Sequence, residues 1–377
     1  MSRPASILIH REAARRNLSA LRALAPRSRV LAVVKADAYG HGMAAMAAAL
    51  RAADALGVAS LDEAAELRAS GWCGAILLLE GVHRASDLGA AARLGCSLVV
   101  HRPGQIEALE AWSGPAFSVW LKADTGMHRL GFLPEEFRAA WQRLHGCAAV
   151  AGDPVLMTHL ANAQARDQAS VAAQVRCFDA VTEGLPGERS IANSAALLSA
   201  PVTHRDWVRP GLALYGVSPF EGVDAPPPGL VPVMHFASEL ISVRTIPAGG
   251  AIGYGGCFIC PVSMNVGVVA AGYGDGYPTG DLTGTPIVVN GVRTRVLGRS
   301  SMDMLTVDLG PVPDPREGDP VEVWGGRITV AEVARHAGSL PWALLCAARL
   351  RVPRAELRPL EDEGPAVLRA LTGSREA

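Results

Sequence analysis

The sequence predicts an α/β protein built from an N-terminal (β/α)8 TIM barrel, residues 1–228, and a C-terminal mostly-β domain, residues 229–377. Two patterns support this fold class. Short apolar runs alternate with longer helical patterns through the first 220 residues, which is typical of parallel strands joined by right-handed crossovers. Residues 224–232 are then rich in proline and read as a stiff linker, and short strand-like runs follow it.

The strands that we expect in the first part span residues 30–34, 56–59, 75–79, 97–100, 117–122, 155–160 and 212–215. Helical patterns lie between most of them, as at residues 42–53 and 61–70. About eight such units fit a closed barrel better than an open sheet. A dinucleotide-binding sheet is the weaker alternative, because no Gly-x-Gly-x-x-Gly follows the first strand.

In the second part we expect strands at residues 237–244, 266–270, 286–289, 292–297, 305–308 and 320–324. Asn290-Gly291 separates two of these runs and is a strong signal for a two-residue hairpin. Residues 332–336 and 341–348 read as short helices within this domain.

Composition excludes several classes of protein. With 49% hydrophobic and 19% charged residues the chain can bury a large core, and its net charge of -1 gives no electrostatic case for nucleic acid. The longest apolar run, residues 43–50, is too short to span a bilayer, and the N-terminus lacks the pattern of a signal peptide. The odd number of cysteines, seven, fits a reducing compartment, so we expect a cytoplasmic protein. Cys257 and Cys260 form a lone Cys-x-x-Cys, which predicts ordinary thiols and no metal site.

Lysine is almost absent from the chain. Of its 35 basic residues only Lys35 and Lys122 are lysines, and the other 33 are arginines. Arginine stays protonated in proteins, whereas a lysine can supply a neutral amine, which alone can bond to a carbonyl carbon or act as a base. The two lysines are therefore expected where arginine cannot work, with compositional drift as the alternative.

Lys35 follows the first strong apolar run, in Val-Val-Lys-Ala-Asp-Ala-Tyr-Gly-His-Gly. Barrel enzymes carry their reactive groups at the C-terminal ends of strands, so Lys35 is a candidate for a covalent bond to a carbonyl cofactor. A lysine that extends into solvent is the alternative. Tyr39 is expected in a loop, where its hydroxyl and nearby N–H groups can meet a phosphate. All five tyrosines lie on or near glycine, which is typical of loops and strand ends.

The segment 33–42 is similar to the cofactor-lysine motif of alanine racemases, a family of fold-type III pyridoxal-phosphate enzymes. The resemblance continues in order through residues 78–81, 122–131, 157–161, 192–196, 206–216, 253–256, 272–277 and 298–303. It implies pyridoxal 5'-phosphate as cofactor and interconversion of L-alanine and D-alanine, for peptidoglycan or for alanine catabolism. It also implies a head-to-tail homodimer, in which each active site joins one barrel to the partner's β domain.

The resemblance implies two catalytic bases. Lys35 would bond covalently to the cofactor and act on the D-enantiomer, and Tyr254 would reach in from the other subunit to act on the L-enantiomer. One base on each face suits racemisation, because a proton leaves Cα on one face and returns on the other. Arg209 would hydrogen-bond the pyridine nitrogen and, being permanently cationic, keep it unprotonated. A surface charge before a turn is the alternative for Arg209.

The other matches concern binding. The phosphate-side residues that the resemblance implies are Tyr39, Ser194, Gly211 and Leu212, with His159 near the cofactor. Arg129 would contact the cofactor's phenolic oxygen and the substrate carboxylate, and Lys122 would be carbamylated to hold that arginine. From the partner subunit, Met302 and Asp303 would lie near the substrate carboxylate and Tyr273 near the entrance. Taken alone, Asn193-Ser194 reads as a helix cap, His159 as a core histidine and Asp303 as a turn residue.

One position departs from the family pattern, because Leu350 aligns with a tyrosine that in many members binds phosphate and braces the opposing tyrosine. The main alternative function is a broader-specificity amino-acid racemase of the same fold. A fold-type III decarboxylase fits the motifs less well. A non-catalytic cofactor-carrying barrel would lack a β domain with Tyr254 and Met302, and an inactive homologue would have lost a key residue such as Lys35 or Arg209.

Overall fold

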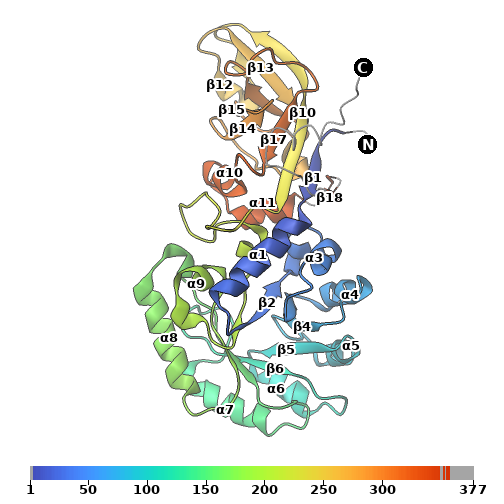
Figure 1. Ribbon diagram of the computed structural model, residues 1–377, viewed down its shortest axis with the longest axis vertical. Coiled ribbons are helices and arrows are strands. Elements are labelled where there is room, and N and C mark those ends of the chain that lie inside the picture. Colours follow the sequence, from blue (N-terminus) through green and yellow to red (C-terminus); the bar gives the residue numbers. More distant parts are fainter. Residues whose placement is uncertain (1–2, 349–350, 353, 357–377) are drawn as a thin grey trace. The chain divides into compact units, whose positions relative to one another are not determined.

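The computed structural model describes residues 3–348, 351–352 and 354–356 (Figure 1). The chain divides into two compact units. One comprises residues 15–214 and 219–221, and the other comprises residues 3–14, 215–218 and the described chain from residue 222 on. The predicted class, a parallel barrel with helices and a separate mostly-β part, is confirmed, whereas the exact boundary between residues 228 and 229 stays a prediction.

Within the stretch 3–348, eight parallel strands close into a barrel. They are β2 (Arg29–Val33), β3 (Ala55–Val58), β4 (Ala75–Leu78), β5 (Cys96–Val100), β6 (Val119–Lys122), β7 (Val155–Met157), β8 (Arg189–Ser190) and β9 (Trp207–Val208). Each strand pairs with the next, and β9 returns to β2 through the pair Val30 and Val208. Closure leaves no free sheet edge in this unit.

One helix, α1, precedes the first of these strands, and others connect the strands, as the alternating pattern predicts. They are α1 (Arg11–Leu24), α3 (Met43–Ala49), α4 (Leu61–Ala69), α5 (Leu88–Arg93), α6 (Pro103–Glu110), α7 (Pro134–His145), α8 (Gln168–Thr182) and α9 (Ser194–Ser199). Local sequence sets their starts: the Ser60 hydroxyl caps α4 by accepting the N–H of Glu63 at 3.2 Å. Among the residues that the structure describes, no helix has the length and apolar character needed to cross a membrane.

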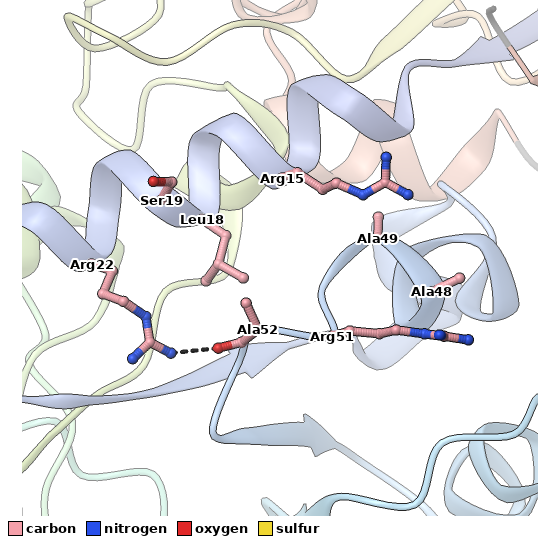
Figure 2. Close-up of a pocket in the computed structure, with 8 residues that line it drawn as sticks. All are labelled: Arg15, Leu18, Ser19, Arg22, Ala48, Ala49, Arg51 and Ala52. Atoms are coloured by element: carbon pink, nitrogen blue, oxygen red, sulfur yellow. Dashed lines mark hydrogen bonds between the residues drawn. The ribbon is translucent and has the colours of Figure 1, made fainter.

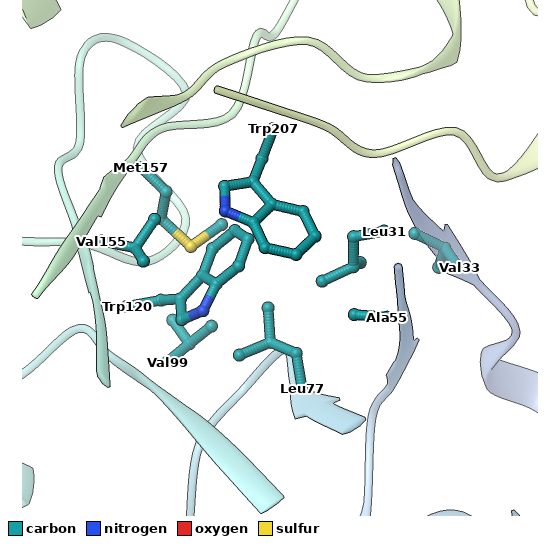
Figure 3. Close-up of a cluster of buried hydrophobic side chains, with 9 residues drawn as sticks. All are labelled: Leu31, Val33, Ala55, Leu77, Val99, Trp120, Val155, Met157 and Trp207. Atoms are coloured by element: carbon teal, nitrogen blue, oxygen red, sulfur yellow. The ribbon is translucent and has the colours of Figure 1, made fainter. Parts of the chain in front are cut away.

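Large apolar side chains fill the barrel interior (Figure 3). The cluster comprises Leu31, Val33, Ala55, Leu77, Val99, Trp120, Val155, Met157 and Trp207. The indole rings of Trp120 and Trp207 lie against each other, with their centroids 5.3 Å apart. The interior is thus a packed core, and reactive groups are expected at the C-terminal ends of the strands and in the loops that follow them.

The predicted strand over residues 212–215 is wrong. The segment forms a short 3-10 turn, Leu212–Tyr215, in which the N–H of Leu214 bonds back to the carbonyl of Gly211 at 2.9 Å. The N–H groups of Gly211 and Ala213 bond to the hydroxyl of Ser194 and not to a neighbouring strand. Apolar composition alone could not distinguish this turn from a strand.

The second unit is built on an eight-stranded sheet of the described residues. Its strands are β1 (Ser6–Ile9), β10 (Met234–Ile246), β13 (Met264–Val269), β14 (Pro286–Val289), β15 (Val292–Arg295), β16 (Leu305–Asp308), β17 (Pro320–Trp324) and β18 (Arg354–Glu356). Asn290 and Gly291 have φ of 45° and 78° and form the predicted hairpin between β14 and β15. Two short helices, α10 (Val330–His336) and α11 (Pro341–Ala347), complete this unit together with the hairpin β11 (Ala251–Ile252) and β12 (Phe258–Ile259).

Candidate active site

Lys35 lies two residues after the end of strand β2 and begins α2 (Lys35–Tyr39), a short left-handed turn. Residues 36–39 have φ of 53–55°, the left-handed region that costs non-glycine residues about 1–2 kcal/mol each. The Glu63 carboxylate holds the turn by accepting the N–H of Ala36 at 2.7 Å and that of Ala59 at 2.7 Å. Backbone strain is therefore fixed beside the predicted reactive lysine, as is common at functional sites.

Tyr39 ends this turn instead of lying in the predicted loop, and its ring packs on the barrel core. Its hydroxyl lies against Gly211, where an added Cβ would be 2.7 Å from Oη. Ser194 accepts the N–H groups of Gly211 at 2.8 Å and Ala213 at 3.2 Å, and Leu212 between them is buried. The four predicted phosphate-side residues thus form one cradle, in which the hydroxyls of Tyr39 and Ser194 can donate to an anion. The N–H groups of Gly211 and Ala213 are donated to Ser194.

Arg209 is buried in the barrel unit and is not the surface charge that its sequence context also allowed. Its guanidinium donates to the hydroxyl of Ser190 and to the carbonyl of Thr158, both at 2.6 Å, and to the carbonyl of Ile191 at 3.3 Å. Its Nη2 lies 3.4 Å from Nδ1 of His159. Burial lowers the pKa of Arg209 to about 10, so the group keeps its charge at neutral pH.

Lys122 ends strand β6 with only 7% of its surface exposed. Burial lowers its pKa from 10.5 to about 8, and the positive charges of Arg209, Arg129 and Lys35 act in the same direction. The Asp124 carboxylate opposes them. The second lysine of the chain is therefore in the environment that its rarity predicted, where a neutral amine is accessible near neutral pH.

His159 follows strand β7 and faces the same cations. Burial holds its pKa well below the ordinary 6.5, and the charges of Arg209, Lys122, Arg129 and Lys35 add to this effect. His159 is therefore a neutral imidazole at physiological pH. These mutual effects show that the predicted cationic residues of the barrel lie together at the C-terminal ends of its strands.

Arg129 is carried by a loop that one carboxylate organises. Oδ1 of Asp124 accepts the N–H groups of Gly126, Met127 and His128 at 3.0–3.1 Å. The backbone between Asp124 and the exposed Arg129 is thereby folded around a single oxygen. Sequence reasoning missed this role of Asp124, although an aspartate before glycine is a signal for such a turn.

The role of Gln174 in α8 was also not predicted from the sequence. Its side chain donates to the hydroxyl of Thr125 and the carbonyl of His159, both at 3.2 Å, and accepts the N–H of Ala161 at 2.9 Å. Thr125 in turn bonds the hydroxyl of Thr158 at 2.8 Å. This network braces the segments that carry Arg129 and His159, and a lone glutamine in a helix gives no local signal for it.

The predicted residues of the second unit are mostly exposed. Tyr254 lies between β11 and β12 and is 72% exposed, Met302 is 53% exposed and Tyr273 is 40% exposed. The backbone N–H of Tyr273 bonds to the carbonyl of Ser301 at 3.0 Å, so Tyr273 and Met302 sit on two joined loops. The Asp303 carboxylate is bound by an arginine and is not a simple turn residue. Leu350 lies outside the described residues.

A separate open cavity of about 530 Å³ lies between α1 and α3 (Figure 2). It is lined by Arg15, Leu18, Ser19, Arg22, Ala48, Ala49, Arg51 and Ala52. The Arg22 guanidinium is engaged by the carboxylate of Asp54 at 2.8 Å. None of the predicted site residues lines this cavity, so it is not the candidate active site.

Comparison with known proteins agrees with the geometry. The chain matches the N-terminal domain of alanine racemase over residues 9–219 and the C-terminal domain of alanine racemase over residues 233–356. The chain belongs to the alanine racemase family. The resemblance stated from the sequence is therefore confirmed, as is the assignment to isomerases.

Individual relatives span nearly the whole chain. The alanine racemase of Halorhodospira halophila is 46% identical over 365 residues, covering 96% of this chain and all of that relative. The crystal structure of the biosynthetic alanine racemase from Pseudomonas aeruginosa has a TM-score of 0.91 at 42% identity, covering 94% of this chain and all of its own. The alanine racemase of Bartonella henselae, solved with covalently bound pyridoxal phosphate, has a TM-score of 0.84 at 28% identity, covering 94% of this chain and 99% of its own.

Proposed function

We propose that the protein is a pyridoxal-phosphate-dependent racemase that interconverts L-alanine and D-alanine by a two-base mechanism. The observation that carries the proposal is the position of its only two lysines. Lys35 and Lys122 both lie at the C-terminal ends of barrel strands, and the charges of both act on His159. Lys122 is also within electrostatic reach of Lys35, Arg129 and Arg209. A chain that uses arginine elsewhere has kept both amines where an active site is expected.

The residues at the barrel mouth fit pyridoxal phosphate. The phosphate would bind in the cradle of Tyr39, Ser194 and Gly211, because a Cβ at position 211 would fill the space beside the Tyr39 hydroxyl. Arg209 would meet the ring nitrogen as a permanent donor, which keeps that nitrogen unprotonated. Lys35 would supply the amine for the covalent bond. Bound there, the cofactor supplies an electron sink for negative charge at Cα of the amino acid.

The residues of the chain would then hold and move the protons. Lys35 would remove or return the proton of Cα on one face, and Tyr254 would do so on the other. Arg129, placed by its Asp124-centred loop, would bind the substrate carboxylate together with the Met302 segment. A carbamate on the neutral amine of Lys122 would give Arg129 a fixed anionic partner.

We infer that the active unit is a homodimer with shared sites. Apolar side chains are exposed on the unit that carries Tyr254 and Met302, and Ile259, Val262 and Met304 add to them. A second copy of the chain would cover this surface and place its Tyr254 opposite Lys35. All seven cysteines are free, which supports the reducing cytoplasm as the place of action, in D-alanine supply or alanine catabolism.

Borohydride reduction tests the cofactor and its attachment together. The reduced holoenzyme should carry the pyridoxyl group on the tryptic peptide of residues 30–51, which contains Lys35. Lys122 is the matched control, because it is the other lysine. A label on Lys122, or no label on either peptide, would overturn the proposed site. Racemisation rates with alanine, serine, lysine and arginine test the substrate, and a poor rate with alanine would refute that assignment.

The two bases can be separated by exchange of the Cα proton in D2O. Tyr254→Phe should slow exchange from L-alanine far more than from D-alanine, and equal losses would argue against two bases. Tyr277→Phe is the control, since the buried Tyr277 hydroxyl has no partner among the described residues. Mixing Lys35→Ala and Tyr254→Phe chains should restore about a quarter of the activity, because only hybrid dimers contain one intact shared site. No recovery after subunit exchange would exclude shared sites.

A further inference from the structure

Two loops of the second unit, residues 272–276 and 301–304, are docked directly on each other. The N–H of Tyr273 bonds to the carbonyl of Ser301 at 3.0 Å, and the N–H of Gly274 bonds to the carbonyl of Met302 at 2.9 Å. These are the loops that carry Tyr273, Met302 and Asp303. Their relative position therefore decides where the proposed substrate-side residues lie.

Glycines allow the two loops and the guanidinium of Arg351 to pack closely. A Cβ at Gly272 would lie 2.3 Å from the carbonyl oxygen of Ser301, so no side chain is tolerated there. A Cβ at Gly274 would lie 2.9 Å from Cζ of Arg351, which shows that this guanidinium packs directly on the loop backbone. The alternating glycines of Gly-Tyr-Gly-Asp-Gly thus have a packing reason at two positions.

A charge cluster of four residues, Arg3, Asp275, Asp303 and Arg351, joins the two loops. Asp275, 1% exposed, accepts Arg3 at 2.9 Å and the N–H of Gly272 at 2.9 Å on one oxygen, and Arg351 at 2.8 Å on the other. Arg351 also donates to the Asp303 carboxylate at 2.5 Å and to the carbonyl of Met302 at 3.2 Å. Arg3 donates to the backbone carbonyl of Asp303 at 3.2 Å. The cluster contains two arginines and two carboxylates, so its positive and negative charges are equal in number.

We propose that Arg351 is a positioning residue of the racemase, which fixes the Met302 segment and neutralises Asp303 so that the substrate carboxylate can approach. This inference rests on the proposed function. Without Arg351, the half-exposed Asp303 would keep only Arg3, whose Nη1 is 3.8 Å away. A net negative charge would then stand beside the segment that meets the substrate carboxylate, and it would repel that anion. Asp275 would keep Arg3 and its backbone donor, so the fold can survive the change.

The test is steady-state kinetics of the holoenzyme with Arg351→Gln, Arg351→Lys and Arg351→Gln/Asp303→Asn. Arg351→Gln should raise KM for L-alanine about tenfold at low salt, with a smaller change in kcat. Because salt screens charge repulsion, adding about 0.5 M salt to the assay should remove most of this increase in KM. Arg351→Lys keeps the charge, and the double variant removes the charge imbalance, so both should return KM to within about threefold of the unmodified protein.

Arg335→Gln is the matched control, because it breaks an exposed arginine–aspartate pair of the same unit, with Asp224, that takes no part in the cluster. An unchanged KM in Arg351→Gln, or an increase that neither salt nor Asp303→Asn relieves, would overturn the inference. Chymotryptic cleavage after Tyr273 provides a readout independent of activity and should be faster in Arg351→Gln. If the unmodified protein did not racemise alanine, the proposed function would fall, and unchanged cleavage would separately refute the positioning of the loops.

Discussion

Replacing Lys122 by methionine should make the protein more stable at neutral pH. The lysine has 7% of its surface exposed, and its pKa falls from 10.5 to about 8 mainly because of burial. One pKa unit corresponds to about 1.4 kcal/mol, so the charged amine destabilises the fold by about 3 kcal/mol at pH 7. Methionine has a similar length and no charge, and it removes this term while still filling the space at the end of β6.

The direction in which pH changes the stability follows from how many protons Lys122 binds in the folded and unfolded states. The unfolded chain binds the proton of Lys122 up to about pH 10.5, whereas the folded chain releases it near pH 8. Between these values the unfolded state binds more protons, so the free energy of unfolding rises with pH and the destabilisation fades. Below pH 8 both states are protonated and the full penalty is present. Lys122→Met should lack the rise.

Urea unfolding between pH 7 and pH 10 in CO2-free buffer measures both quantities. Tryptophan fluorescence is a suitable probe, because Trp120 and Trp207 lie inside the barrel. Lys35→Met is the control for loss of one lysine, and it should keep most of the rise that belongs to Lys122, because Lys35 is the smallest of the causes that lower the pKa of Lys122. The reasoning is refuted if Lys122→Met is no more stable than the parent at pH 7, or if both proteins respond equally to pH.

Two further changes test the geometry of the barrel mouth. Gly211→Ala places a Cβ 2.7 Å from Oη of Tyr39, so we expect pyridoxal phosphate to bind about tenfold more weakly in a titration. Gly89→Ala, whose Cβ meets nothing closer than 3.6 Å, is the control, and equal affinities in the two variants would contradict the cradle. Asp124→Ala removes the acceptor of three N–H groups, so stability to urea should fall by about 3 kcal/mol. KM for alanine should rise more than kcat falls, because Arg129 loses its support, and an unchanged KM would show that Arg129 does not depend on this loop.

The sequence predicted the strands that can be identified from their own residues and immediate neighbours. Strands β14, β16 and β17 were predicted with their observed bounds. Strand β14 is an apolar run, and β16 and β17 alternate apolar and polar residues, so each has its signal within its own residues. Strands β8 and β9 have two residues each and carry no periodicity that a pattern could show. Strand β1 belongs to the sheet of the second unit through its pairing with β10, more than 200 residues later, and no local pattern contains that information.

For the candidate site, too, the sequence indicated some residues and not others. Lys35 and Lys122 could be singled out because composition made lysine rare and strand ends made their positions meaningful. The left-handed turn after Lys35 could not be predicted, because its conformation depends on Glu63, which is 28 residues away and reaches the turn only in the folded barrel. The same holds for Gln174, whose partners come from two separate segments, one with Thr125 and one with His159 and Ala161.

The electrostatics of the barrel mouth connect stability with function. Lys35, Arg129 and Arg209 each lower the pKa of Lys122, and all four cations act on His159, while Asp124 opposes them at Lys122. Mutual repulsion among these cations destabilises the fold by itself, so selection for stability alone would remove some of them. Their convergence is useful only if anions bind among them, and a phosphate, a phenolate and a substrate carboxylate would supply those charges. Binding of the cofactor should therefore stabilise the barrel through the same charges that weaken the protein without it.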